Sequence, residues 1–191
     1  MAQSPPPPEI AFLASTAGGA LTVALGLALL AITIYWARRP GHPDRPAAVL
    51  AATATSLLVA LITVIALAAG WWQGAFFQIP LLVALAIDLP LSIAGYTLWL
   101  GLYRWLARHT RRPFLIYAAG VIIFIPVVLL VDPVQLSRGQ FQMGAGYTVW
   151  ADALVGQLVM LSPAAFYELF RRRGPVGVRQ DSPLETSQSG R

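Results

Sequence analysis

Five long runs of apolar residues divide the chain, and short polar links separate them. A bilayer core of about 30 Å requires roughly 20 apolar residues in a helix, and each run meets or nearly meets that length. Because backbone polar groups in lipid must be satisfied within the segment, the runs predict helices. Their continuous apolar character excludes the alternating strands of a membrane barrel. The predicted spans are residues 10–36, 47–70, 79–106, 113–131 and 147–170.

The arginines give these spans an orientation. They are concentrated in the link between the first and second spans, in the link between the third and fourth, and directly after the fifth. The other two links carry almost no charge, so the positive-inside rule places the arginine-rich links in the cytoplasm. The sequence therefore predicts an all-α integral membrane protein with five transmembrane helices, an outside N-terminus and a cytoplasmic C-terminus.

The ends of the chain differ in composition from its centre. Residues 1–8 are rich in proline and are expected to be an extracytoplasmic N-terminus, ahead of a transmembrane domain over residues 9–173. They contain no Lys or Arg and precede an apolar run longer than a signal sequence requires, so we expect the first helix to be retained. Residues 174–191 are rich in Gly, Pro, Ser and Gln, which is typical of a disordered tail, here cytoplasmic.

Composition narrows the class of protein further. The chain is 57% hydrophobic and 11% charged, whereas soluble domains are about 25% charged. There is no Cys and no Lys, which excludes thiolate and Schiff-base chemistry, and with only two His we expect no metal or cofactor. The absence of Lys and Asn indicates a GC-rich genome, so we expect a protein of the bacterial cytoplasmic membrane. The arginines form no continuous stripe, which argues against nucleic-acid binding.

Besides Glu168 at the inner end of the fifth span, two carboxylates lie inside predicted spans. Asp88 is about 13 Å below the outer boundary, and Asp152 is roughly 8–12 Å below the same surface, at 1.5 Å per helical residue. A charge at the bilayer centre costs about 2.5–3.5 kcal/mol, so intramembrane acids are functional candidates. If the two carboxyl groups face each other, repulsion and burial would hold a proton on one of them near neutral pH. We therefore interpret them as a candidate acid/base pair.

Polar and aromatic residues accompany these acids. Three of them follow Asp88 along one helical face, a tryptophan lies beside Asp152, and an outer-loop arginine could reach inward to pair with one acid. Together they predict an outward-facing acidic and aromatic pocket lined by Ser92, Tyr96, Trp99, Trp150 and Arg138. A purely structural interpretation stays open, because either Asp could bind a carbonyl or tie two helices together.

Two local features are interpreted as structural. Pro163 lies within the fifth span and frees the Val159 carbonyl from its helical hydrogen bond. Glu168 precedes Arg171 and Arg172 by three and four residues, the spacing of helical ion pairs.

Small residues recur every fourth position on the first two spans and permit close helix contact. We expect the two stripes to face each other, and the first also offers a surface for a homo-oligomer or another membrane protein. They are Ala14, Gly18, Thr22 and Gly26 on the first span, and Ala48, Ala52, Ser56 and Ala60 on the second.

The pocket favours an integral-membrane enzyme that uses acid–base chemistry on a lipophilic, isoprenoid-like substrate. Two alternatives remain open. The first is an accessory or scaffolding subunit of a membrane complex, which the small-residue stripes fit equally well. The second is a proton-linked carrier, in which intramembrane carboxylates and kinked helices are common.

Overall fold

The computed structural model describes residues 16–39, 44–73, 81–123, 125–126 and 142–173. The structure is almost entirely helical, with one pair of two-residue strands among these residues. In chain order the elements are α2 (Thr16–Arg38), α3 (Arg45–Ala68), β1 (Trp72–Gln73), α4 (Leu81–His109), α5 (Pro113–Ile123), β2 (Gln142–Met143) and α7 (Val149–Arg173).

Four of the helices, α2, α3, α4 and α7, are long and apolar enough to cross a membrane. The predicted second, third and fifth spans agree with α3, α4 and α7 to within a few residues. The first and fourth are only partly described, since residues 1–15 and 127–141 lie outside the described part, and α5 has 11 residues. The predicted N-terminal segment and the tail from residue 174 also lie outside the described residues. Orientation in the membrane remains a prediction.

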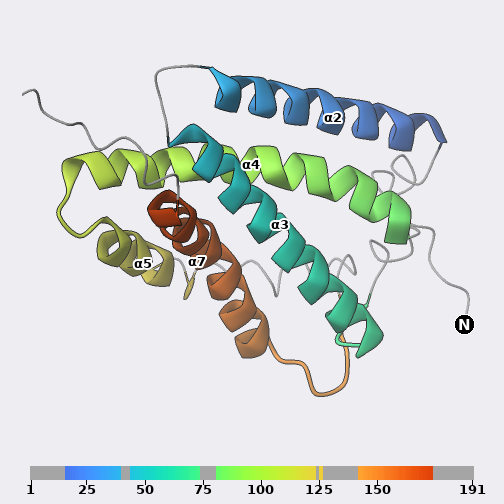
Figure 1. Ribbon diagram of the computed structural model, residues 1–191. Helices are drawn as coiled ribbons and strands as arrows, with labels where there is room; N and C mark the ends of the chain where they lie inside the picture. Colours follow the sequence, from blue (N-terminus) through green and yellow to red (C-terminus); the bar gives the residue numbers. More distant parts are fainter. Residues whose placement is uncertain (1–15, 40–43, 74–80, 124, 127–141, 174–191) are drawn as a thin grey trace, which may run out of the picture.

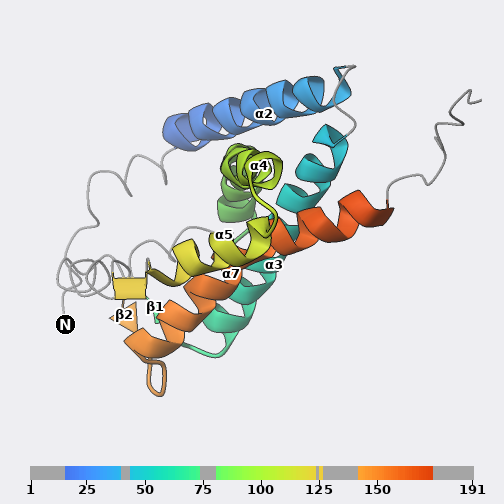
Figure 2. The same cartoon turned by 90° about the vertical axis from the view of Figure 1, so that its left-hand side faces the viewer.

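The helices pack in an order that differs from their order in the chain. Helix α2 packs mainly on α4, α4 packs on α3, and α3 packs on α7, while α5 contacts both α4 and α7. In both views α2 lies along one side of α4, and α3, α5 and α7 lie on the other (Figures 1 and 2). The central position of α4 means that most interhelical contacts depend on it.

The small-residue stripe of α2 faces α4. A Cβ atom on Gly26 would lie 3.2 Å from Cβ of Pro90 and 3.7 Å from the Ile87 carbonyl oxygen. The prediction that the stripes of the first two spans face each other is therefore wrong at Gly26. The small side chains of α3, such as Ala48 and Ala51, instead belong to a core shared with α4, α5 and α7. Whether a second chain also uses the α2 stripe remains a prediction.

Three tyrosines form the centre of that core. Tyr103 of α4 makes edge-to-face contacts with Tyr117 of α5 and Tyr167 of α7, with ring centroids 5.3 and 5.8 Å apart. Leu100 and Ala164 are fully buried beside them. Aromatic pairs in this geometry contribute about 0.5–1.5 kcal/mol beyond the area they bury. The core therefore lies where α3 and α5 begin and where α4 and α7 end.

The proline inside α7 is accommodated locally. The Val159 carbonyl, which Pro163 leaves without its helical donor, accepts a hydrogen bond of 2.8 Å from Ser162 Oγ. Ser162 Oγ also lies 3.3 Å from Thr55 Oγ1 of α3. The carbonyl freed by Pro163, as the sequence predicted, is thus satisfied within the chain and sits next to a polar contact between helices.

At the opposite end of the molecule, backbone hydrogen bonds join two short segments that are far apart in the sequence. Strands β1 and β2 pair antiparallel, with Trp72 opposite Met143, and Gly144 N donates to the Trp71 carbonyl at 2.7 Å. The Tyr147 ring stacks on Trp71 at 5.6 Å. This pairing links the two loops that the sequence predicts on the outer side, so both lie at one end of the molecule.

Candidate functional site

Asp88 lies on an outward face of α4. Its side chain is exposed, and Ser92 Oγ donates to Asp88 Oδ1 at 3.1 Å. Farther along the same helix, Trp99 Nε1 donates to the Tyr117 hydroxyl, which in turn donates to the Met160 carbonyl of α7 at 2.6 Å. The predicted polar stripe is therefore split between Asp88, which faces outward, and Trp99, which joins α5.

Asp152 lies in the first turn of α7, which begins at Val149. The Tyr147 hydroxyl donates to Asp152 Oδ1 at 2.9 Å, and Ala151 N donates to Thr148 Oγ1 at 3.2 Å. A carboxylate in the first turn is stabilised by the helix dipole. The neighbouring Trp150 is 67% exposed, as expected for an interfacial tryptophan.

The two candidate acids have separate hydrogen-bond partners. Asp88 bonds Ser92 on its own helix, whereas Asp152 bonds Tyr147 just before α7. Arg138 lies outside the described residues. The described contacts therefore do not bring Asp88 and Asp152 together, and the acid/base pair stays a prediction.

A charged cluster that the sequence did not single out surrounds Asp44, just before α3. Its Oδ2 atom accepts from Arg104 Nε at 2.7 Å and lies 2.6 Å from Arg104 Nη2. The Tyr167 hydroxyl donates to the same oxygen at 3.2 Å. Burial raises the pKa of Asp44, but the hydrogen bond and charge of Arg104 outweigh that effect, and the pKa lies below its ordinary value of 3.8.

The Trp36 ring extends this cluster to α2. The Arg45 and Arg104 guanidinium groups lie 4.9 and 5.3 Å from its centroid, within cation–π range. The cluster thus connects α2, α3, α4 and α7. One sequence signal could have found it, because Asp44 is the only carboxylate in the two arginine-rich links.

Glu168 forms a second cluster near the end of α7. Its Oε2 atom accepts a hydrogen bond of 3.0 Å from Arg171, so the predicted helical ion pair is confirmed for Arg171. Its Oε1 atom accepts from the Tyr103 hydroxyl at 2.8 Å. The sequence did not predict this second contact, which joins residues 65 positions apart.

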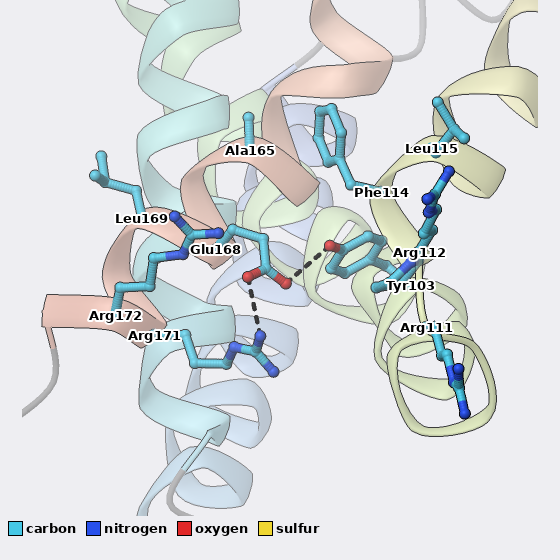
Figure 3. Close-up of a pocket in the computed structure, with 11 residues that line it drawn as sticks. Tyr103, Arg111, Arg112, Phe114, Leu115, Ala165, Glu168, Leu169, Arg171 and Arg172 are labelled. Atoms are coloured by element: carbon cyan, nitrogen blue, oxygen red, sulfur yellow. Dashed lines mark hydrogen bonds and ion pairs between the residues drawn. The ribbon is translucent and has the colours of Figure 1, made fainter.

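Glu168 faces a groove between the start of α5 and the end of α7 (Figure 3). The groove has a volume of about 830 Å³. Its apolar lining comes from Pro113, Phe114, Leu115, Ala165 and Leu169, and its polar lining from Tyr103, Arg111, Arg112, Glu168, Arg171 and Arg172. We call it the arginine groove.

The arginine groove carries a surplus of positive charge. Of its four guanidinium groups, only that of Arg171 has a carboxylate partner within ion-pair distance in the part of the chain described here. Arg111, Arg112 and Arg172 are exposed. With Glu168 as the one carboxylate, the lining holds three uncompensated positive charges beside an apolar wall.

Neither a metal cluster nor a known relative defines this site. Across residues 16–39, 44–73, 81–123, 125–126 and 142–173, no three His, Asp or Glu side chains lie together so that they could hold a metal ion. Comparison with protein-family models, curated proteins and solved structures finds no match. The apolar helices are compatible with a multi-pass membrane protein, and the argument for function rests on the chain's own geometry.

Proposed function

We propose that this chain is a multi-pass protein of the bacterial cytoplasmic membrane, with its N-terminus outside and its C-terminus inside, that binds a lipid with an anionic phosphate headgroup. The arginine groove is the binding site, and it opens to the cytoplasmic leaflet. One observation carries the proposal, namely that four guanidinium groups and five apolar residues line the same groove.

The charges suit a phosphate headgroup. Guanidinium groups bind phosphate oxygens through paired, charge-assisted hydrogen bonds. The groove lies at the ends of apolar helices, at the depth where headgroups would reside, and each Arg near an anionic leaflet contributes about 1 kcal/mol of attraction. The start of α5 at Pro113 adds the positive end of a helix dipole.

The apolar wall suits the hydrocarbon part of the same molecule. Phe114 and Leu115 come from the first turn of α5, and Ala165 and Leu169 come from α7 (Figure 3). A lipid chain that follows this wall runs between α5 and α7 toward the membrane interior. A free inorganic anion would gain nothing from these side chains, which is why we favour an amphiphile.

Glu168 determines where the headgroup lies. Its carboxylate accepts hydrogen bonds from Arg171 and from the Tyr103 hydroxyl. Its negative charge also repels an anion from that part of the groove. A phosphate is therefore expected on Arg111, Arg112 and Arg172, whose side chains have no carboxylate partner within the described ranges.

Native mass spectrometry of the detergent-solubilised protein tests the proposal, with phosphatidylglycerol as the probe. The double variant Arg112→Gln/Arg172→Gln should weaken phosphatidylglycerol binding by about tenfold or more, because two cationic contacts of roughly 1 kcal/mol are lost. Diacylglycerol, which lacks the phosphate, should bind weakly to both proteins.

The control is Arg38→Gln/Arg39→Gln, which removes the same charge from the same end of the molecule but outside the groove. Equal weakening by both pairs would reject the groove as the site. Displacement of phosphatidylglycerol by glycerol 3-phosphate alone would show that the groove binds a free anion rather than a lipid.

An acid–base enzyme for a lipophilic, isoprenoid-like substrate is the second candidate function. It is favoured by Asp88, a carboxylate inside a helix apolar enough to cross a membrane, whose Oδ1 atom accepts a hydrogen bond of 3.1 Å from Ser92 Oγ. On this proposal, Asp88→Asn and Asp152→Asn keep the fold and abolish turnover. A proton-linked carrier would instead lose transport driven by a pH gradient in proteoliposomes, and a scaffolding subunit would tolerate both substitutions.

A further inference from the structure

One carboxylate lies among the cations of the arginine groove. The Glu168 side chain is 17% exposed, and it lines the groove together with Arg111, Arg112 and Arg172. A phosphate group has no hydrogen to donate when it is fully ionised, and a carboxylate repels it. The phosphate contacts proposed above therefore give Glu168 no partner, and its free acceptor positions are left to another part of the bound lipid.

Two hydrogen bonds from different helices hold this carboxylate in place. Oε1 accepts from the Tyr103 hydroxyl of α4 at 2.8 Å, and Oε2 accepts from Arg171 of α7 at 3.0 Å. Tyr103 is fully buried and packs edge-to-face on Tyr117 and Tyr167, so its hydroxyl is held beside Glu168. Figure 3 shows the carboxyl group pointing toward both donors. The groove thus contains an acceptor whose position is set before a ligand binds, which lowers the cost of binding.

Glu168 is better suited to accept a further hydrogen bond than to attract a cation. A carboxylate has about four lone-pair positions, and the described residues supply donors from Tyr103 and Arg171 only. Arg171 also supplies a positive charge, with its Nη2 atom 3.0 Å from Oε2. Because three further guanidinium groups line the same groove, a ligand ammonium would meet a surplus of positive charge, whereas a neutral hydroxyl would not. A hydroxyl group is therefore the donor that matches this site.

We infer that the arginine groove selects a phosphodiester lipid whose headgroup alcohol carries free hydroxyl groups, as phosphatidylglycerol does, and that Glu168 accepts a hydrogen bond from one of them. The inference rests on the proposed function and adds the class of headgroup to it. The phosphate lies on Arg111, Arg112 and Arg172, and the alcohol beyond it reaches the carboxylate of Glu168. A headgroup without a hydroxyl leaves Glu168 without this donor, and one with an ammonium group adds to the positive charge of the groove.

Two lipids of equal charge test the inference on the natural chain. Phosphatidylmethanol is a singly charged phosphodiester like phosphatidylglycerol, but its headgroup has no hydroxyl. In native mass spectrometry of the detergent-solubilised full chain, with identical acyl chains on both lipids, phosphatidylglycerol should bind about tenfold more tightly, because it alone donates a hydrogen bond to the carboxylate. Equal binding would overturn the inference. Phosphatidylethanolamine should also bind more weakly than phosphatidylglycerol, and a preference for it would show that Glu168 pairs with a cation instead.

Substitutions then show which residue produces the selectivity. Glu168→Gln should reduce the preference for phosphatidylglycerol over phosphatidylmethanol to about threefold, because a neutral hydrogen bond is roughly half as strong as a charge-assisted one. Glu168→Ala should remove the preference. The matched control, Arg112→Gln/Arg172→Gln, should weaken both lipids equally and leave their ratio unchanged.

The two proposals fail in different ways. A preference that is unchanged in Glu168→Gln and Glu168→Ala would overturn the role of Glu168 and leave the groove as a lipid site. Unchanged binding of both lipids to Arg112→Gln/Arg172→Gln would instead reject the groove itself. The comparison of lipids on the natural chain needs no substitution, so misfolding of a variant cannot account for its result.

Discussion

The two ends of the helical assembly are held together in different ways. At the arginine-rich end, Asp44, Arg104, Tyr167 and Trp36 connect four helices through side chains. At the other end, β1 and β2 connect two loops through backbone hydrogen bonds, and aromatic rings cover the pairing. The comparison shows that the charged end depends on particular residue types, whereas the other end depends on how closely two backbones approach.

The largest expected effect comes from breaking the charged end. Asp44→Ala leaves the Arg104 side chain, which is 10% exposed, without its carboxylate. Removing one partner of a buried pair costs about 3–5 kcal/mol, because the remaining charge is uncompensated. Unfolding in a graded detergent mixture measures the loss. Arg171→Ala is the control, since Arg171 is exposed, such pairs contribute about 1 kcal/mol or less, and the hydrogen bond from Tyr103 to Glu168 is kept. Equal losses would contradict a special role for the Asp44 cluster.

At the opposite end, Gly144→Ala should be the most disruptive small change. The added Cβ atom would lie 1.7 Å from the Gly70 carbonyl oxygen, so the β1–β2 pairing must shift. Forced repacking of this kind typically costs about 1–3 kcal/mol. Gly156→Ala is the matched control, because a Cβ atom there meets nothing within 4 Å. Hydrogen exchange of the Gly144 amide, which now donates to the Trp71 carbonyl, should accelerate in Gly144→Ala only. Unchanged protection would show that the pairing tolerates the displacement.

The smallest of the three effects is a dependence of the folding stability on pH, which we expect from Asp44 at the arginine-rich end. Because the pKa of Asp44 is lower in the folded chain than its ordinary 3.8, protonation favours the unfolded state. The stabilisation from Asp44 is therefore complete above its ordinary pKa and is lost as the pH falls through the folded-state pKa. The difference in unfolding midpoint between the natural chain and Asp44→Asn should stay constant near neutral pH and shrink in strong acid. If the difference in unfolding midpoint instead grows as the pH falls, the pKa of Asp44 is raised in the folded chain, which would contradict the ion pair with Arg104.

The sequence predicted the long helices well for a simple reason. Apolar length in lipid is a local property, so the ends of α3, α4 and α7 follow from composition alone. Which helices pack together is not local. Gly26 could have faced any neighbour with a complementary surface, and only the three-dimensional arrangement places it on Pro90.

The candidate site was harder to predict for a related reason. Asp44 and Arg104 are 60 residues apart, and Tyr103 and Glu168 are 65 apart, so no spacing pattern connects them. Depth within the membrane guided the choice of Asp88 and Asp152, but depth does not determine which face of a helix a side chain occupies. The charged links were interpreted only as indicators of orientation, although they also hold Asp44 and part of the arginine groove.

The packing of α2 on α4 also sets an order of events during synthesis. A ribosome adds about 5–20 residues per second, so several seconds separate the emergence of Gly26 from that of Pro90. In that interval the first helix has only α3 beside it, although in the folded chain it packs mainly on α4. The close contact of Gly26 with Pro90 can form only after α4 has been synthesised. The first helix therefore reaches its final packing position later than it is made.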